Sequence, residues 1–216
     1  MRLHTSLVVV LLLSFWAMTG CKSAYYGMWS KLGYEKRDIL VSEVEDAKKD
    51  QEKAKEQFKT TMQRFQELTG FQGGDLEAKY KKLNSDYEAC KSRANAVTKQ
   101  IADVDTTAKD MFKEWKNELD KYQDPNLRAK SEEKLTESKA RYQDLITAMR
   151  KAEGSMQPVL KAFNDQVLFL KHNLNAQAIA SLQTTSQEID ANVQQLIKDM
   201  EASINEANEF ISGLKT

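Results

Sequence analysis

The clearest feature of the sequence is a heptad pattern of apolar positions that recurs along most of the chain. Alternating steps of four and three residues from Leu76 reach twelve positions, all apolar or aromatic: Leu76, Tyr80, Leu83, Tyr87, Cys90, Ala94, Val97, Ile101, Val104, Ala108, Met111 and Trp115. Sustained spacing of this kind is typical of a coiled-coil seam. The step breaks at Glu118 and resumes one residue later at Leu119, a stutter that locally unwinds a supercoil.

Three further stripes of helical spacing cover the rest of the chain. The first has seven apolar positions out of nine: Leu40, Val44, Ala47, Gln51, Ala54, Phe58, Thr61, Phe65 and Leu68. The last has nine out of eleven: Ile179, Leu182, Ser186, Ile189, Val193, Leu196, Met200, Ser203, Ala207, Phe210 and Leu214. Between them lies a looser stripe: Leu127, Leu135, Tyr142, Leu145, Met149, Ala152, Met156, Val159, Phe163, Val167, Leu170 and Leu174. We interpret all of them as core positions.

Three short segments rich in turn-forming residues separate four predicted helices. The segment 69–75 contains three glycines and ends in Asp75, a typical N-cap. Asp124 and Pro125 are typical of a helix start, and the asparagines of 171–176 indicate a weaker turn. Pro158 is expected to kink or briefly break the third helix. The predicted helices are 24–69, 76–122, 126–172 and 177–214.

Short connections make neighbouring helices antiparallel. The sequence therefore predicts an all-α fold, an elongated up-down-up-down bundle with coiled-coil packing over residues 35–216. Four amphipathic helices can close a monomeric core, yet the same seams could pair between chains, so a homo-oligomer is an open alternative.

Residues 1–20 have the pattern of a signal peptide. The apolar run from Leu7 to Met18 is interrupted only by Ser14, and it is shorter than the roughly 20 residues that a spanning helix needs. It ends in Met-Thr-Gly-Cys at positions 18–21, which resembles a bacterial lipobox with methionine where leucine is usual. The resemblance implies signal cleavage between Gly20 and Cys21, diacylglycerol on the Cys21 thiol, and a fatty acid such as palmitate on the new amino group. The alternatives are an ordinary secreted protein with a free Cys21 and an uncleaved anchor.

Lipid on Cys21 would hold the chain permanently at a membrane. Lys22 follows it, where an aspartate would favour the inner membrane, so we expect an outer-membrane anchor facing the periplasm, with the inner membrane as the alternative. The membrane-proximal segment 21–34 contains four large aromatic side chains: Tyr25, Tyr26, Trp29 and Tyr34. They suit the headgroup level of a bilayer, and packing on neighbouring helices explains them equally well.

Composition narrows the choice of partner and chemistry. Residues 1–20 contain one basic residue, Arg2, and no acidic one, so the remaining chain has 31 Lys and Arg against 32 Asp and Glu. This balance gives no general attraction to nucleic acid. The chain has two cysteines, and Cys90 lies on an apolar stripe. An inert buried thiol is therefore expected at Cys90, and an intermolecular Cys90–Cys90 bridge is the alternative.

A catalytic or metal site is hard to assemble from this sequence. His172 is the only histidine after position 20, which leaves too few ligands for a zinc or copper site of the usual kinds. No nucleophile motif accompanies it, and no phosphate-binding loop of the G-x-x-x-x-G-K-[ST] type is present. The carboxylates are interleaved with lysines, as on a solvated coiled-coil flank. We therefore expect no enzyme activity, no cofactor and no metal.

Two local features stand out as candidate contact sites for a partner. The Val-Leu-Phe-Leu run at 167–170 is apolar on all sides, so it is expected to be buried within the bundle or against a partner. Phe71 lies between glycine-containing turns, where it either exposes an aromatic ring or packs as an ordinary loop residue. The candidate partner-binding tip consists of these residues: Phe71, Phe169, Lys171, His172 and Asn173.

The lipobox, the central heptads and the segment DQVLFLKHNLNAQAI at 165–179 together support a family resemblance. The sequence resembles a family of uncharacterised helical coiled-coil lipoproteins, a domain of unknown function in Gram-negative proteobacteria. The resemblance covers nearly the whole chain and implies a periplasmic helical protein, with no activity or site to carry over.

The function expected from these features is that of a non-enzymatic, membrane-anchored helical rod. It would act as a scaffold, adaptor or spacer in the cell envelope, with its tip contacting a periplasmic protein. A BAR-like membrane-remodelling module is one alternative, but it needs a basic stripe that the interleaved charges do not provide. A peptidoglycan-binding module is another, without a recognisable motif.

Overall fold

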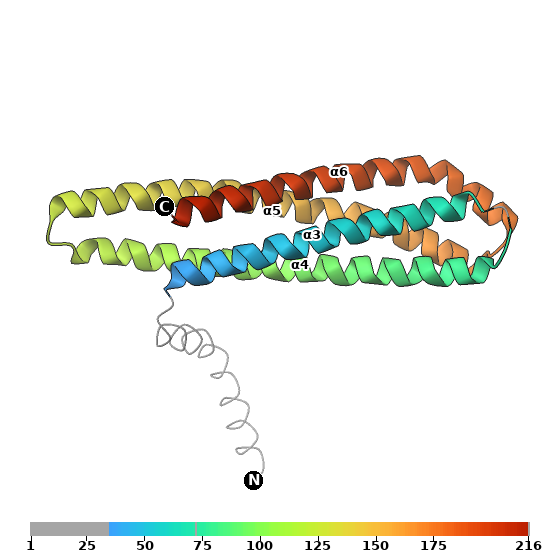
Figure 1. Cartoon of the computed structure of the whole chain (residues 1–216), viewed down its shortest axis with the longest axis horizontal. Helices are drawn as coiled ribbons and strands as arrows, with labels where there is room; N and C mark the ends of the chain where they lie inside the picture. The colour runs from blue at the N-terminus through green and yellow to red at the C-terminus, as the bar shows by residue number, and fades with distance from the viewer. Residues whose placement is uncertain (1–34, 72, 216) are drawn as a thin grey trace, which may run out of the picture. The chain divides into compact units, whose positions relative to one another are not determined.

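The computed structural model describes residues 35–71 and 73–215. Within these ranges the chain forms four long helices, a short 3-10 turn and no strand: α3 (Lys36–Thr69), α4 (Leu76–Glu118), η1 (Leu119–Lys121), α5 (Pro125–His172) and α6 (Ala176–Lys215) (Figure 1). The predicted all-α bundle is confirmed. The expectations for the signal peptide, Gly20, Cys21 and the aromatic segment 21–34 lie outside the described residues.

The chain divides into two compact units, Met1–Ile39 and Leu40–Thr216. Of the first, the structure describes the start of α3. Within the second, the connections 70–75 and 173–175 lie at one end, which we call the distal end, and the connection 122–124 lies at the other, the hairpin end (Figure 1). The helices therefore alternate in direction, as the short connections predicted.

The helices begin at side chains that satisfy their free backbone N–H groups. Asp75 Oδ1 accepts a hydrogen bond of 2.9 Å from the N–H of Ala78, and Asp124 Oδ1 accepts one of 2.8 Å from Asn126. Asn175 Oδ1 caps α6 in the same way, at 2.9 Å from the N–H of Ala178. In the 70–75 connection, Gly73 and Gly74 have positive φ angles of 143° and 112°, which glycine adopts without steric cost.

The core follows the predicted stripes closely. All nine positions of the stripe on α3 are buried, including the polar Gln51 and Thr61. The stripe on α4 is buried from Leu83 to Met111, and its two ends are half-buried. Leu127 and Leu174 are exposed, so their assignment to the core was wrong. Both lie beside a connection, where no neighbouring helix covers them.

Polar contacts between helices show which elements are neighbours. Ser203 on α6 bonds to Gln51 on α3, and Ser155 on α5 bonds to Asp199 on α6. Trp115 Nε1 on α4 donates a hydrogen bond of 2.8 Å to Ser131 Oγ on α5. These contacts join α3 to α6, α5 to α6 and α4 to α5, and the rings of Phe65 on α3 and Phe163 on α5 meet across the core at 6.4 Å between centroids.

Two local features differ from the sequence-based prediction. α5 runs through Pro158 as an uninterrupted helix, so the predicted brief break does not occur. The ring removes the donor that would bond to the carbonyl of Gly154, but both residues are exposed and water can satisfy that oxygen. The stutter at Leu119 coincides with the end of α4, where the chain tightens into the 3-10 turn η1.

Candidate functional site

Large apolar side chains are exposed at the two ends of the bundle and not along its sides. Five such residues are exposed in the described part of the chain: Tyr122 41%, Leu127 53%, Leu168 49%, Phe169 41% and Leu174 37%. Tyr122 is the first residue of the 122–124 connection, and Leu127 lies in the first turn of α5 after it. The other three lie at or just before the 173–175 connection, at the distal end. The distal group is the larger candidate contact surface.

The distal group arises from the geometry of the last turns of α5. Val167 and Leu170 are buried, whereas Leu168 and Phe169 point away from the core. Successive helical residues are rotated by about 100°, so a run of four apolar residues cannot place all four on one face. The prediction that this run is buried within the bundle is wrong for Leu168 and Phe169. Its alternative, contact with a partner, stays a prediction.

The other predicted tip residues differ in how much surface they offer. Phe71 is half-buried and packs against the core, as the loop-packing interpretation expects. Lys171 and His172 are exposed at the end of α5. The side-chain amide of Asn173 already bonds to the end of its own helix, because its Nδ2 donates a hydrogen bond of 2.9 Å to the carbonyl oxygen of Phe169. Leu168 and Leu174, which sequence reasoning did not include, therefore contribute more open apolar surface than Phe71 or Asn173.

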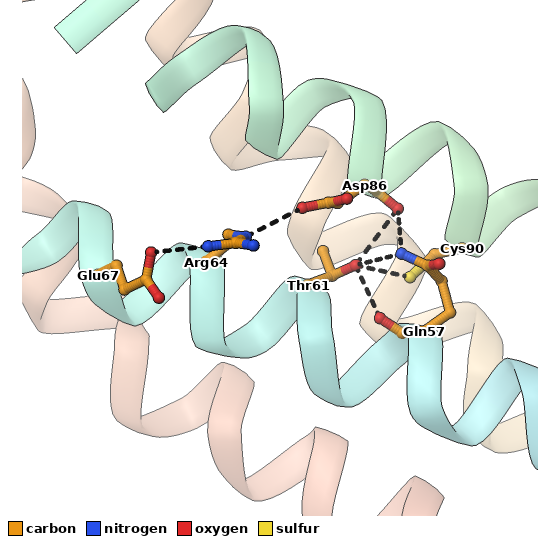
Figure 2. Close-up of polar contacts among 6 residues, drawn as sticks. All are labelled: Gln57, Thr61, Arg64, Glu67, Asp86 and Cys90. Carbon is orange, nitrogen blue, oxygen red and sulfur yellow. Dashed lines mark hydrogen bonds and ion pairs between the residues drawn. The ribbon is translucent and has the colours of Figure 1, made fainter. Parts of the chain in front are cut away.

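A buried polar cluster links α3 and α4 nearer the middle of the bundle (Figure 2). The Thr61 hydroxyl lies 2.9 Å from the carbonyl oxygen of Gln57 and 3.1 Å from Cys90 Sγ. The same hydroxyl lies 3.3 Å from the carbonyl oxygen of Asp86, and either Thr61 or the Cys90 thiol can donate in the contact between them. The Gln57 amide crosses to the carbonyl oxygen of Asp86 at 3.3 Å. These contacts hold the two helices together.

Cys90 is free and fully buried, in agreement with the expected buried thiol. Burial is the main effect on this thiol, and the pKa is raised to about 12. The hydrogen bond with Thr61 lowers the pKa, and the nearby Asp86 raises it. The nucleophilic thiolate is therefore scarce at neutral pH. A Cys90–Cys90 bridge between chains would require the helices to separate.

A second polar cluster surrounds Asp199 on α6. Its carboxylate accepts hydrogen bonds from Ser155 Oγ at 2.5 Å and Gln195 Nε2 at 2.9 Å, and it pairs with Lys151 Nζ at 2.9 Å. Burial raises the pKa of this carboxyl, but the three donors together lower it below its usual range. Ser155 donates to a carboxylate of low basicity, so this arrangement does not activate the hydroxyl as a nucleophile.

The described residues contain no group of three or more His, Cys, Asp or Glu side chains placed to hold a metal ion. None of the helices in the described ranges is long and apolar enough to cross a membrane.

The family of the chain follows from comparison with known sequences. A family model described as "Protein of unknown function (DUF2959)" matches residues 25–214. The chain belongs to this family. The match spans all four long helices, and the predicted membership of an uncharacterised family is confirmed. Comparison with curated proteins and with solved structures returned no match.

Proposed function

We propose that this protein is a non-enzymatic helical rod of the cell envelope, anchored by lipid on Cys21, whose distal end contacts a periplasmic protein. It acts as a scaffold, adaptor or spacer. The observation that carries this proposal is the placement of exposed apolar side chains at the ends of the bundle and nowhere on its described sides. A rod that joins two structures needs contact surfaces at its ends and a soluble shaft between them.

The shaft has the properties that a spacer requires. Its surface charges form ion pairs along single helices, such as Lys99 with Asp103 at 2.8 Å and Lys109 with Asp105 at 2.8 Å. Such pairs make a solvated surface and contribute little to stability. The continuous core beneath these charges stiffens the unit. A helix of 43 residues, the length of α4, spans about 65 Å.

The orientation of the rod follows from the proposed anchor. α3 runs toward the distal end, so a lipid attached before α3 would leave the distal end free to reach away from the membrane. Lys22 after the cysteine favours the outer membrane. Leu168, Phe169 and Leu174 would then face a periplasmic partner.

Site-specific crosslinking in living cells tests the proposal. A photoreactive residue is placed at Phe169 or Leu174, and a matched control at Thr98, which is exposed near the middle of α4. We expect an adduct with one periplasmic protein from the two distal positions and none from Thr98. Adducts formed only between identical chains or with lipid would rule out the adaptor role and favour self-assembly on the membrane.

A second experiment separates the rod from a membrane-remodelling module. A straight rod does not bend a bilayer, so a Cys21→Ser chain freed of its signal peptide should not tubulate anionic liposomes. Tubulation of those liposomes by the variant would contradict the proposal.

A further inference from the structure

A pocket between α3 and α4, close to the distal end, has the lining of an anion site. It has a volume of about 240 Å³ and is lined by Arg64, Glu67, Leu68, Ala78, Lys79 and Lys82. This volume holds several water molecules, and therefore a small organic anion. We propose that the pocket binds a phosphate group carried on a short apolar moiety. The inference is independent of the proposed contact at Phe169.

Arg64 supplies the donor at the inner wall of the pocket. Its Nη1 pairs with Glu67 Oε2 at 3.2 Å, on the same helix (Figure 2). Its Nε lies 3.6 Å from Asp86 Oδ2, which is too long for a hydrogen bond, and both of these atoms are buried without a hydrogen-bond partner. The guanidinium is thus held in place by two carboxylates, and because Nε is buried against Asp86, only the terminal Nη groups are available to a ligand in the pocket. A preoriented guanidinium of this kind suits phosphate oxygens.

Lys79 and Lys82 supply two further positive charges from the opposite wall. They lie three residues apart on α4, so they project from the same side of the helix. Both are exposed, and neither forms an ion pair with any residue in the described part of the chain. Lys81, which lies between them, pairs instead with Glu77 at 2.7 Å. Arg64 is already paired with Glu67 and with Asp86 behind it, so the unbalanced positive charge of the lining comes from Lys79 and Lys82.

The number and kind of donors favour phosphate over a carboxylate. A phosphate monoester presents up to two negative charges and three terminal oxygens, which matches one guanidinium and two ammonium groups. Leu68 and Ala78 provide an apolar wall for the group that carries the phosphate. Both a soluble phosphomonoester and a phospholipid headgroup present this chemistry.

Calorimetric titration tests the site with the full chain, carrying Cys21→Ser and held in detergent micelles. The probes are inorganic phosphate, glycerol phosphate, and micelles containing phosphatidic acid or phosphatidylcholine. The site variant is Lys79→Gln with Lys82→Gln. The matched control is Lys113→Gln with Lys116→Gln, which removes two exposed lysines with the same spacing from the other end of α4.

We expect saturable binding of a phosphate-bearing probe, with a Kd that rises about tenfold or more in the site variant because two charge-assisted contacts are lost. The control should retain the affinity of the parent chain. Binding of glycerol phosphate identifies a soluble ligand class, and binding of phosphatidic acid micelles alone identifies a lipid headgroup. The absence of binding to every probe, or an equal loss in the site variant and the control, would overturn the proposal.

Discussion

The hydroxyl of Ser203 on α6 donates a hydrogen bond of 3.0 Å to the side-chain carbonyl oxygen of Gln51 on α3, and both residues are fully buried. The amide nitrogen of Gln51 has no hydrogen-bond partner in the described part of the chain. A buried amide that is only half satisfied adds little net stability. We infer that this pair specifies the register of α3 against α6, as a single polar core residue does in coiled coils.

A pair of variants tests that role. Ser203→Ala should lower the free energy of unfolding by about 1–3 kcal/mol, because the Gln51 carbonyl oxygen then loses its partner as well. The double variant with Gln51→Leu should recover most of this loss, since no buried polar group remains. Both effects are measured as shifts of the urea unfolding midpoint, with the slope of the unfolding free energy against urea concentration unchanged. A double variant less stable than Ser203→Ala alone would show that the pair contributes net stability.

The buried thiol of Cys90 predicts a loss of stability at alkaline pH. Burial raises its pKa to about 12 from the usual 9.0, so the folded chain keeps a proton that the unfolded chain releases. The stability is therefore fully present below pH 9 and falls between pH 9 and 12, by at most about 1.4 kcal/mol per pH unit. We expect the free energy of unfolding of Cys90→Ala to fall less steeply than that of the parent between pH 9 and 10. If the unfolding free energies of the two chains fell equally steeply with pH, the folded structure would not raise the pKa of the Cys90 thiol.

Tyr142 and Asp105 predict the opposite dependence at acidic pH. The Tyr142 hydroxyl donates to Asp105 Oδ1 at 2.5 Å. Burial raises the pKa of the Asp105 carboxyl, but hydrogen bonds from Lys109 and Tyr142 outweigh it and hold the pKa below the usual 3.8. This stabilisation is present above about pH 4 and is lost as the pH falls through the lowered pKa.

Tyr142→Phe should therefore destabilise the chain by about 1–2 kcal/mol at pH 7, the range of a partly exposed hydrogen bond to a charged group. The difference from the parent should shrink at pH 3, below the usual carboxyl pKa of 3.8, because this stabilisation is lost as the pH falls toward the lowered pKa. Urea unfolding at the two pH values measures it. An equal difference at both pH values would show that the hydrogen bond to the Asp105 carboxylate is not its source, because the variant keeps the ring that contacts Phe112 and Phe210.

The spacing of apolar residues was sufficient to predict which face of each helix is buried. It succeeded even at Gln51 and Thr61, because the position on the helix decides burial before the residue type does. Asp75 and Asp124 were recognised as N-caps because they precede the helix and follow turn residues. Asn175 was not, because the asparagines around it left several possible starts for α6.

The ends of the bundle and the pocket could not be predicted in the same way. Leu127 and Leu174 continue the spacing of the stripe on α5, but spacing does not show where the neighbouring helices stop. Near the C-terminus, Arg141 of α5 lies directly against Gly213, so α5 extends beyond the end of α6. The contact of Arg64 with Asp86 likewise depends on the register between α3 and α4, which the sequence of either helix alone does not contain.

Pro158 lies inside α5, where it lacks the donor for the carbonyl of Gly154. An interior proline costs a helix about 3 kcal/mol, less where the freed carbonyl reaches water. Pro158→Ala should therefore raise the free energy of unfolding by about 1–3 kcal/mol, which thermal or urea unfolding detects. An unchanged midpoint would show that the local backbone already accommodates the ring.

Leu168 and Phe169 allow a test of whether the distal apolar surface serves stability or contact. Because both are exposed, replacing both by serine should change the free energy of unfolding by no more than about 0.5–1 kcal/mol. Leu170→Ala, one residue away and fully buried, should cost about 2–5 kcal/mol and serves as the control. The serine variant should at the same time lose the crosslink formed from Leu174. A large loss of stability in that variant would instead assign Leu168 and Phe169 to the fold, and the apolar surface would then need no partner to explain it.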